Sequence, residues 1–238
     1  MSIEFNPDSG HLRLDRDSFA RLTEWFREGR PGAVPPELSA AGALDDQGDL
    51  HPVPLACLAT VAAPLCRIAV RMTDPAGRLE QGDLWLGPEV AGMLLELPDG
   101  RAELGLLHPI FVPVMLWRVL ALGPRLRLSA DAVAVDPGTL DQLTDPRPER
   151  RADAVRVLAQ HGVTGAEELR CDARVQASWV APGGAPGIRV VRVLDTPAGL
   201  WHVTREGDLA LLTPTTASAV WRELVSVLPN DQELPASE

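Results

Sequence analysis

The chain has 238 residues, with 33 acidic side chains against 22 basic ones, a formal net charge of −11, and a hydrophobic content of 45%. These figures predict a folded, water-soluble protein rather than a disordered one. Every basic residue is Arg and there is no Tyr, which excludes a P-loop lysine, a lysine Schiff base and a phenolic catalyst.

The charge distribution also argues against nucleic acid as a partner. Acidic residues outnumber basic ones 17 to 10 in residues 1–124 and 16 to 12 in residues 125–238, whereas phosphate contacts need clustered positive charge.

The helical part of the most apolar stretch, residues 104–122, would be only about 18 Å long, too short to span a bilayer. The start of the chain lacks a basic and apolar leader pattern. We therefore expect a soluble, cytoplasmic protein without membrane insertion.

The first half is expected to run from a strand and an Asp-capped helix, through antiparallel strands, to a second apolar helix. The turn Pro98-Asp99-Gly100 is the clearest hairpin signal, because Gly tolerates a positive φ. Thr73–Gly82 is interpreted as a polar loop between strands. The expected elements are a strand from residue 11, helices over 17–29 and 54–63, strands over 67–72, 83–87, 89–97 and 102–107, and a helix over 110–122, with an irregular loop over 30–51.

The second half is expected to repeat this order. Its clearest strand is 171–179, where apolar and polar residues alternate. The glycine-rich stretch 183–187 lies between two strands, so it predicts a hairpin loop and not a phosphate site. The expected elements are a strand over 132–135, a helical turn over 139–143, a helix over 149–160, strands over 171–179, 188–194, 200–205 and 208–212, and a helix over 215–228.

Two segments of the first half match two segments of the second half in the same order. Residues 11–22 align without gaps to 132–143, sharing a strand that leads into an Asp-capped helix. Leu104–Pro109 matches Leu209–Pro214, and each leads to a helix carrying Trp-Arg. Strand–Pro–helix junctions also recur by chance, so the shared order matters more than either match.

We therefore predict an α+β fold made of two pseudo-symmetric halves that arose by internal duplication. A single domain would contain both halves, about 11–122 and 132–228, followed by an acidic tail over 229–238. Their strands would join in one largely antiparallel sheet with helices packed against it.

No residue pattern indicates catalysis, a cofactor or a metal. The five His stand outside any HExxH motif, and no GxSxG motif is present. Cys57, Cys66 and Cys171 lack CxxC spacing, so we expect reduced thiols, with Cys171 buried on the apolar side of its strand. The six Trp fit core packing, and an exposed subset at a binding surface is the alternative. These observations predict a protein that is not an enzyme.

The order of elements resembles the EspG family, chaperones associated with ESX (type VII) secretion in high-GC Gram-positive bacteria. The most specific segment is Arg189-Val-Val-Arg-Val-Leu-Asp195-Thr-Pro-Ala-Gly199-Leu-Trp201. It is similar to the family's basic/apolar strand, Asp-Thr-x-x-Gly turn and aromatic strand. Leu200 and Trp201 stand where Arg and Tyr are commoner. The resemblance covers about residues 10–228.

The resemblance implies a cytosolic protein that covers the apolar tip of a helical secretion substrate, a PE–PPE-type heterodimer, and keeps it soluble for export. In the family a strand–strand loop of the first half and helices of the second half grip this client. Here they correspond to Thr73–Gly82 and the helices at 149–160 and 215–228. The candidate partner-binding residues are Arg78, Leu79, Glu80, Arg151, Val155 and Leu158.

Other interpretations stay open at this stage. The loop also fits a solvated connection, and the helix at 149–160 a plain cover for the sheet. The protein could be a non-catalytic partner- or ligand-binding protein of the same fold outside secretion. A pocket of converging polar groups with perturbed pKa values would instead indicate an enzyme. Genes for small helical secreted proteins beside this one would favour the chaperone.

Overall fold

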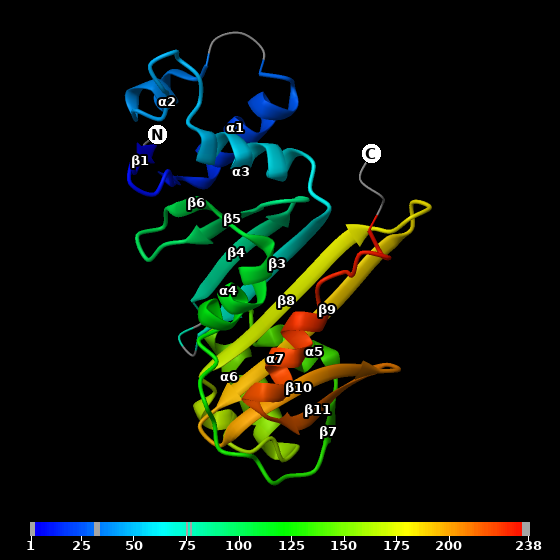
Figure 1. Cartoon of the computed structure of the whole chain (residues 1–238). Helices are drawn as coiled ribbons and strands as arrows, with labels where there is room; N and C mark the ends of the chain where they lie inside the picture. The colour runs from blue at the N-terminus through cyan, green and yellow to red at the C-terminus, as the bar shows by residue number, and fades with distance from the viewer. Residues whose placement is uncertain (1–2, 31–33, 75, 77, 235–238) are drawn as a thin grey trace.

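The computed structural model describes residues 3–30, 34–74, 76 and 78–234, and its strands form one sheet of eleven strands (Figure 1). The order across the sheet is β1-β2-β6-β5-β4-β3-β8-β9-β10-β11-β7, and every neighbouring pair is antiparallel. The predicted α+β class and largely antiparallel sheet are confirmed.

The elements have the following bounds. The strands are β1 (Glu4–Phe5), β2 (Leu12–Leu14), β3 (Cys66–Thr73), β4 (Leu79–Leu86), β5 (Ala91–Glu96), β6 (Ala102–Leu107), β7 (Val133–Val135), β8 (Cys171–Val180), β9 (Pro186–Thr196), β10 (Gly199–Glu206) and β11 (Leu209–Thr215). The α-helices are α1 (Arg16–Arg27), α2 (Pro36–Ala40), α3 (Pro52–Ala62), α4 (Val112–Val119), α5 (Pro137–Gln142), α6 (Pro148–Gln160) and α7 (Ala217–Ser226). Short 3-10 turns occupy Pro109–Phe111 and Ala166–Glu168.

The strand order is symmetric about the contact between β3 and β8. Reading outward from this contact, the first half gives β3-β4-β5-β6-β2 and the second half gives β8-β9-β10-β11-β7. Val70 pairs with Val175 in the middle of the β3–β8 ladder. The matching segments of the sequence become corresponding strands, β2 with β7 and β6 with β11. The duplication itself stays a prediction, which superposition of residues 11–122 on 132–228 would test.

Local sequence signals account for corresponding turns and caps in the two halves. The Asp15 carboxylate accepts from the backbone N–H of Ser18 at 2.7 Å and begins α1, and Asp136 begins α5 in the same way. Gly100 turns the chain between β5 and β6 with a φ of +81°, and Gly207 turns it between β10 and β11 with a φ of +60°. These residues place the helices and hairpins where the sequence pattern predicted them.

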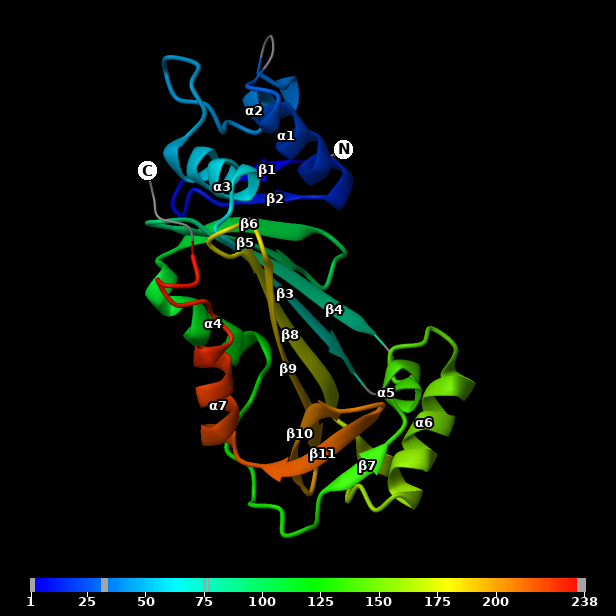
Figure 2. The same ribbon diagram turned by 90° about the vertical axis from the view of Figure 1, so that its right-hand side faces the viewer.

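The helices cover the two faces of the sheet unequally. On one face, α4 and α7 pack together over the central strands, and we call this the covered face. On the other face, α1 and α3 cover the outer strands of the first half, while α5 and α6 cover those of the second half. Figure 2 shows α4 and α7 on one side of β3 and β8 and α6 on the other. We call this second side the open face, because its centre lies between the two groups of helices.

The largest differences from the sequence prediction fall in three regions. The predicted loop Thr73–Gly82 is shorter, because Leu79 already pairs with Thr73 and Leu79–Gly82 belongs to β4. The loop therefore spans 74–78, of which Pro75 and Gly77 lie outside the described residues. The helix predicted over 110–122 is a 3-10 turn followed by the shorter α4. The stretch 30–51 contains α2, whose five residues are too few to show a helical period.

Side chains predicted to be buried follow the pattern only in part. Trp117 and Trp221 are both half-buried, and their rings pack edge to face at 5.7 Å where α4 meets α7. Cys57 and Cys66 are buried in different cores, which places them apart. Cys171, predicted to be buried, is partly exposed because it begins its strand.

Candidate partner-binding surface

The centre of the open face is a stretch of sheet with a polar floor. Alternate residues of β3 and β8 point to this side and line a hollow of about 200 Å³: Arg67, Ala69, Arg71, Arg174, Gln176 and Ser178. The residues between them, such as Val70 and Val175, are buried under α4 and α7. The floor of the hollow is therefore the solvent-facing half of strands whose other half forms the core.

Three arginines lie side by side across the open face, and we call them the arginine row. Arg71 on β3 is directly opposite Arg174 on β8, which is directly opposite Arg192 on β9. Arg192 forms a two-bond ion pair with Asp172, at 2.9 and 2.6 Å. Over the described part of the chain, Arg71 and Arg174 pair with no carboxylate. The row is thus neutralised at one end only.

Exposed apolar side chains lie on the same face as the arginine row. Val180, Ile188 and Val190, on the hairpin of β8 and β9, are 58%, 61% and 45% exposed, and the strand register places them on the open face. Leu79 at the start of β4 is 39% exposed and pairs with Thr73 on the same side. Apolar groups beside arginines are typical of a protein interface.

The β3–β4 loop contacts the start of α6 at one end of the open face. The Nη2 of Arg151 donates to the carbonyl of Ala76 at 3.0 Å, and its Nη1 donates to two carbonyls just before α6, at 2.8 and 3.1 Å. The Asp74 carboxylate accepts hydrogen bonds from the backbone N–H of Arg78 at 2.8 Å and from the Nε of Arg78 at 3.3 Å. The predicted loop and the predicted helix of the second half therefore lie together.

The six predicted partner-binding residues differ in exposure and in the face of the sheet that they share. Arg78 and Leu79 are exposed, and Arg151 is half-buried at the loop–helix contact. Val155 is half-buried against the core under α6. Leu158 is completely buried, because it packs α6 onto the sheet. The prediction that Leu158 contacts a partner is therefore wrong.

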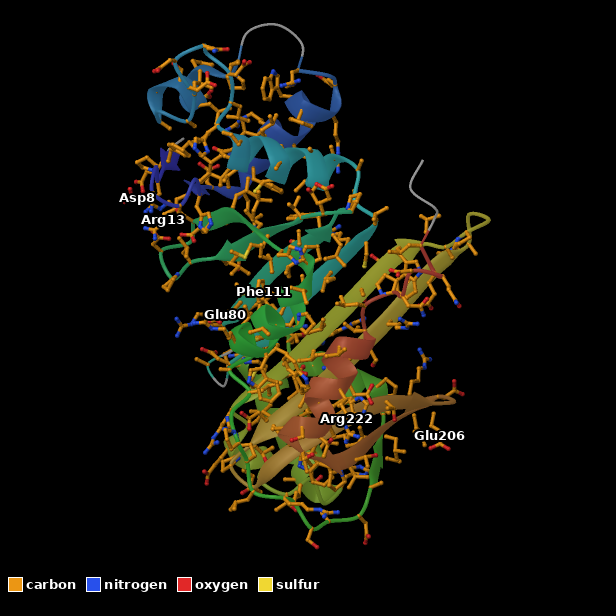
Figure 3. The ribbon with its side chains drawn as sticks, viewed as in Figure 1. Asp8, Arg13, Glu80, Phe111, Glu206 and Arg222 are labelled. Atoms are coloured by element: carbon orange, nitrogen blue, oxygen red, sulfur yellow. The ribbon has the colours of Figure 1, made fainter. Side chains whose placement is uncertain are left out.

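Glu80 is exposed but points to the other side of the sheet. Successive residues of a strand face opposite sides, so Glu80 shares the covered face while Leu79 shares the open face; Figure 3 labels Glu80. Glu80 and Leu79 cannot contact one partner on the same face. The helix predicted over 215–228 is α7, which also lies on the covered face and so is excluded from a surface shared with α6.

The segment Arg189–Trp201, which carries the family resemblance, stabilises the fold. Asp195 forms a two-bond ion pair with Arg125, at 3.0 and 2.7 Å, and so holds the connection between the halves. Trp201 is completely buried, and its Nε1 donates to the carbonyl of Thr164 at 3.4 Å. Leu200 is also completely buried. The two departures from the family pattern, Leu200 and Trp201, therefore concern core packing.

The sequence prediction missed the arginine row and the apolar residues near it. Alternation of Arg67 and Arg71 with Ile68 and Val70 predicted a half-buried strand correctly. Arginines at such positions are by default solvated. Only the tertiary arrangement shows that Arg71 on β3 lies opposite Arg174 on β8. The available signal was an apolar residue at alternate, solvent-facing positions: Val190 is exposed where a polar residue is expected.

Other chemistry finds little support in the described part of the chain. Among these residues, no group of three or more His, Cys, Asp or Glu could hold a metal ion. None of the described helices combines the length and the apolarity that a membrane span requires. Burial raises the pKa of the Cys57 thiol to about 12 and that of Cys66 to about 11, which keeps both protonated and unreactive at neutral pH.

Comparison with known proteins gives a fold but no close relative. No protein-family model and no curated protein matches the sequence. Among solved structures, the chain is similar to the Mycobacterium tuberculosis type VII secretion system chaperone EspG5, whose structure was determined in complex with a PE25–PPE41 dimer. The TM-score is 0.60 at 13% sequence identity, and the match covers 96% of this chain and 98% of that one. The chain therefore has an EspG-like fold, which confirms the resemblance.

Proposed function

We propose that this protein is a cytoplasmic chaperone or adaptor for type VII (ESX) secretion. It would bind the apolar tip of a helical substrate of the PE–PPE type, keep it soluble and deliver it for export. The observation that chiefly supports this is the full-length similarity to EspG5, solved together with a PE25–PPE41 dimer. Because a fold alone does not give a function, the proposal also depends on the surface.

The open face has the features that such a client requires. An apolar helix tip exposed to water promotes aggregation, and covering it removes that liability. The β3–β4 loop and α6 together form one end of this face, where Arg151 joins them. Leu79 and the exposed residues of the β8–β9 hairpin offer apolar contacts on both sides of the polar hollow. Binding of this kind needs no catalytic group.

Co-expression tests the proposal directly. The chain would carry an affinity tag and be produced with each PE–PPE-type pair encoded near its gene. We expect one pair to co-purify with the chain and to be insoluble without it. If every such pair is soluble alone and fails to co-purify, the proposal is contradicted.

Replacing Arg78 and Leu79 together by Ser tests whether the client contacts the end of the β3–β4 loop and the start of β4. Both side chains are exposed, so the free energy of unfolding should change by no more than roughly 0.5 kcal/mol. Binding of a verified client should weaken by about 1–2 kcal/mol, the size of an interface hot spot. Leu209→Ser is the matched control, because Leu209 is a similarly exposed Leu at the start of β11. Undiminished capture by the double variant would exclude the loop from the site.

A further inference from the structure

We infer that Arg71 and Arg174 together receive one carboxylate of the bound protein partner, so that the open face selects a helix tip carrying Glu or Asp among apolar residues. The inference rests on the proposed function and adds a charge requirement to it. It begins from the register of the sheet, which sets these two arginines directly opposite each other on neighbouring strands.

The arginines that flank this pair on the open face are each neutralised by an aspartate. Arg192, the third member of the arginine row, is paired with Asp172 at 2.6 Å, and Arg67, four residues before Arg71, is paired with Asp83 at 2.8 Å. Within the described residues, the side chain of Arg174 donates only to Gln176, at 2.9 Å, and the side chain of Arg71 forms no ion pair or hydrogen bond.

Two like charges directly opposite each other destabilise a sheet. A protein with 33 acidic residues and a net charge of −11 could neutralise these two arginines as it does their neighbours. A carboxylate placed between the two guanidinium groups would accept charge-assisted hydrogen bonds from both and remove the repulsion. The geometry therefore points to a negative group supplied from outside the chain.

The surroundings of the pair indicate a carboxylate of a protein rather than a nucleic-acid backbone. A phosphate backbone needs a track of positive charge, whereas the next arginines on this face already hold Asp83 and Asp172. Apolar side chains lie on both sides of the pair, Leu79 on β4 and Val190 on β9. The expected partner surface is thus apolar with a single acidic side chain in its centre.

Two short helical peptides test the inference without a client. They share a leucine-rich face and differ only at its centre, which is Glu in one peptide and Gln in the other. The full chain should bind the Glu peptide about tenfold more tightly, as expected for hydrogen bonds to a charged group, and added salt should reduce the difference. Equal affinity for the two peptides, or no binding of either at millimolar concentration, would overturn the inference.

Variants of the chain assign the selectivity to the two arginines. Arg71→Gln with Arg174→Gln should abolish the preference for the Glu peptide. Arg222→Gln, an exposed arginine of α7 on the covered face (labelled in Figure 3), should retain it. In the free protein, each single Gln variant should melt at the same temperature as the wild type or slightly higher, because repulsion is removed. A clear fall in melting temperature of both singles would mark the pair as structural and overturn the inference.

The peptide and client experiments distinguish a failure of the proposed function from a failure of the carboxylate site. If no PE–PPE-type pair is captured but the Glu peptide is preferred, the proposed function fails and the carboxylate site stands. If a client is captured equally well by the wild type and by the double Gln variant, the proposed function stands and the carboxylate site is refuted. Tighter binding of single-stranded DNA than of the Glu peptide would also refute it, in favour of a nucleic-acid partner.

Discussion

The ion pair between Arg192 and Asp172 leads to the sharpest stability prediction. The Asp172 side chain is only 3% exposed, and both of its oxygens accept from Arg192, at 2.9 and 2.6 Å. Arg192 also donates to the carbonyl of Leu140 at 2.7 Å and so ties α5 to the sheet. Replacing Arg192 by Met keeps most of the side-chain volume but leaves a buried carboxylate without its cation.

Removing one partner of a buried ion pair costs about 3–5 kcal/mol. In a chain of this size each kcal/mol lowers the melting temperature by about 2–4 °C, so Arg192→Met should melt about 6–20 °C below the wild type in scanning calorimetry. The double variant Arg192→Met with Asp172→Leu should recover more than half of the loss, because no charge stays buried. A single variant that melts within about 2 °C of the wild type, or a double variant as unstable as the single, would refute the reasoning.

Three further predictions concern other parts of the fold. The Cys57 and Cys66 thiols, whose pKa values burial raises to about 12 and about 11, should react with a thiol reagent at pH 8 only as fast as the protein unfolds. Gly187→Ala should destabilise the protein by about 1–3 kcal/mol in urea unfolding, because a Cβ there would overlap the Trp179 ring. Leu158→Ala should cost about 2–5 kcal/mol by the same measurement, as expected for a core residue and not for a partner contact.

Most of the fold could be predicted because its signals are local. Strand alternation, Asp caps and the two glycine hairpins each depend on a few neighbouring residues, and they placed most elements within a few residues of their bounds. The two repeated segments then predicted one sheet with corresponding strands, and the strand order agrees with this. The elements missed, β1, α2 and the 3-10 turn Ala166–Glu168, are too short to show a period.

The site could be predicted only as a pair of elements. The loop before Leu79 and the helix carrying Arg151 do meet, but which of their side chains face outward depends on the face that each element buries. Leu158 is a candidate because the resemblance assigns its helix to the client, yet its side chain faces the sheet. Glu80 looked like a loop residue because polar residues hid the start of β4. In both cases a side-chain direction was needed that the local pattern does not contain.

The topology itself explains where the proposed binding surface lies. The helices that follow β6 and β11, α4 and α7, meet over the centre of one face and pack through Trp117 and Trp221. The helices beside β2 and β7 stay over the outer strands of the other face. One centre of the sheet is therefore covered and the other stays open (Figure 2). The open centre consists of β3 and β8, one strand from each half. Each strand carries an arginine at the same position of the ladder, so two positive charges lie opposite each other. The pairing of Arg71 with Arg174 follows from that arrangement, and a partner's carboxylate is the group that would relieve it.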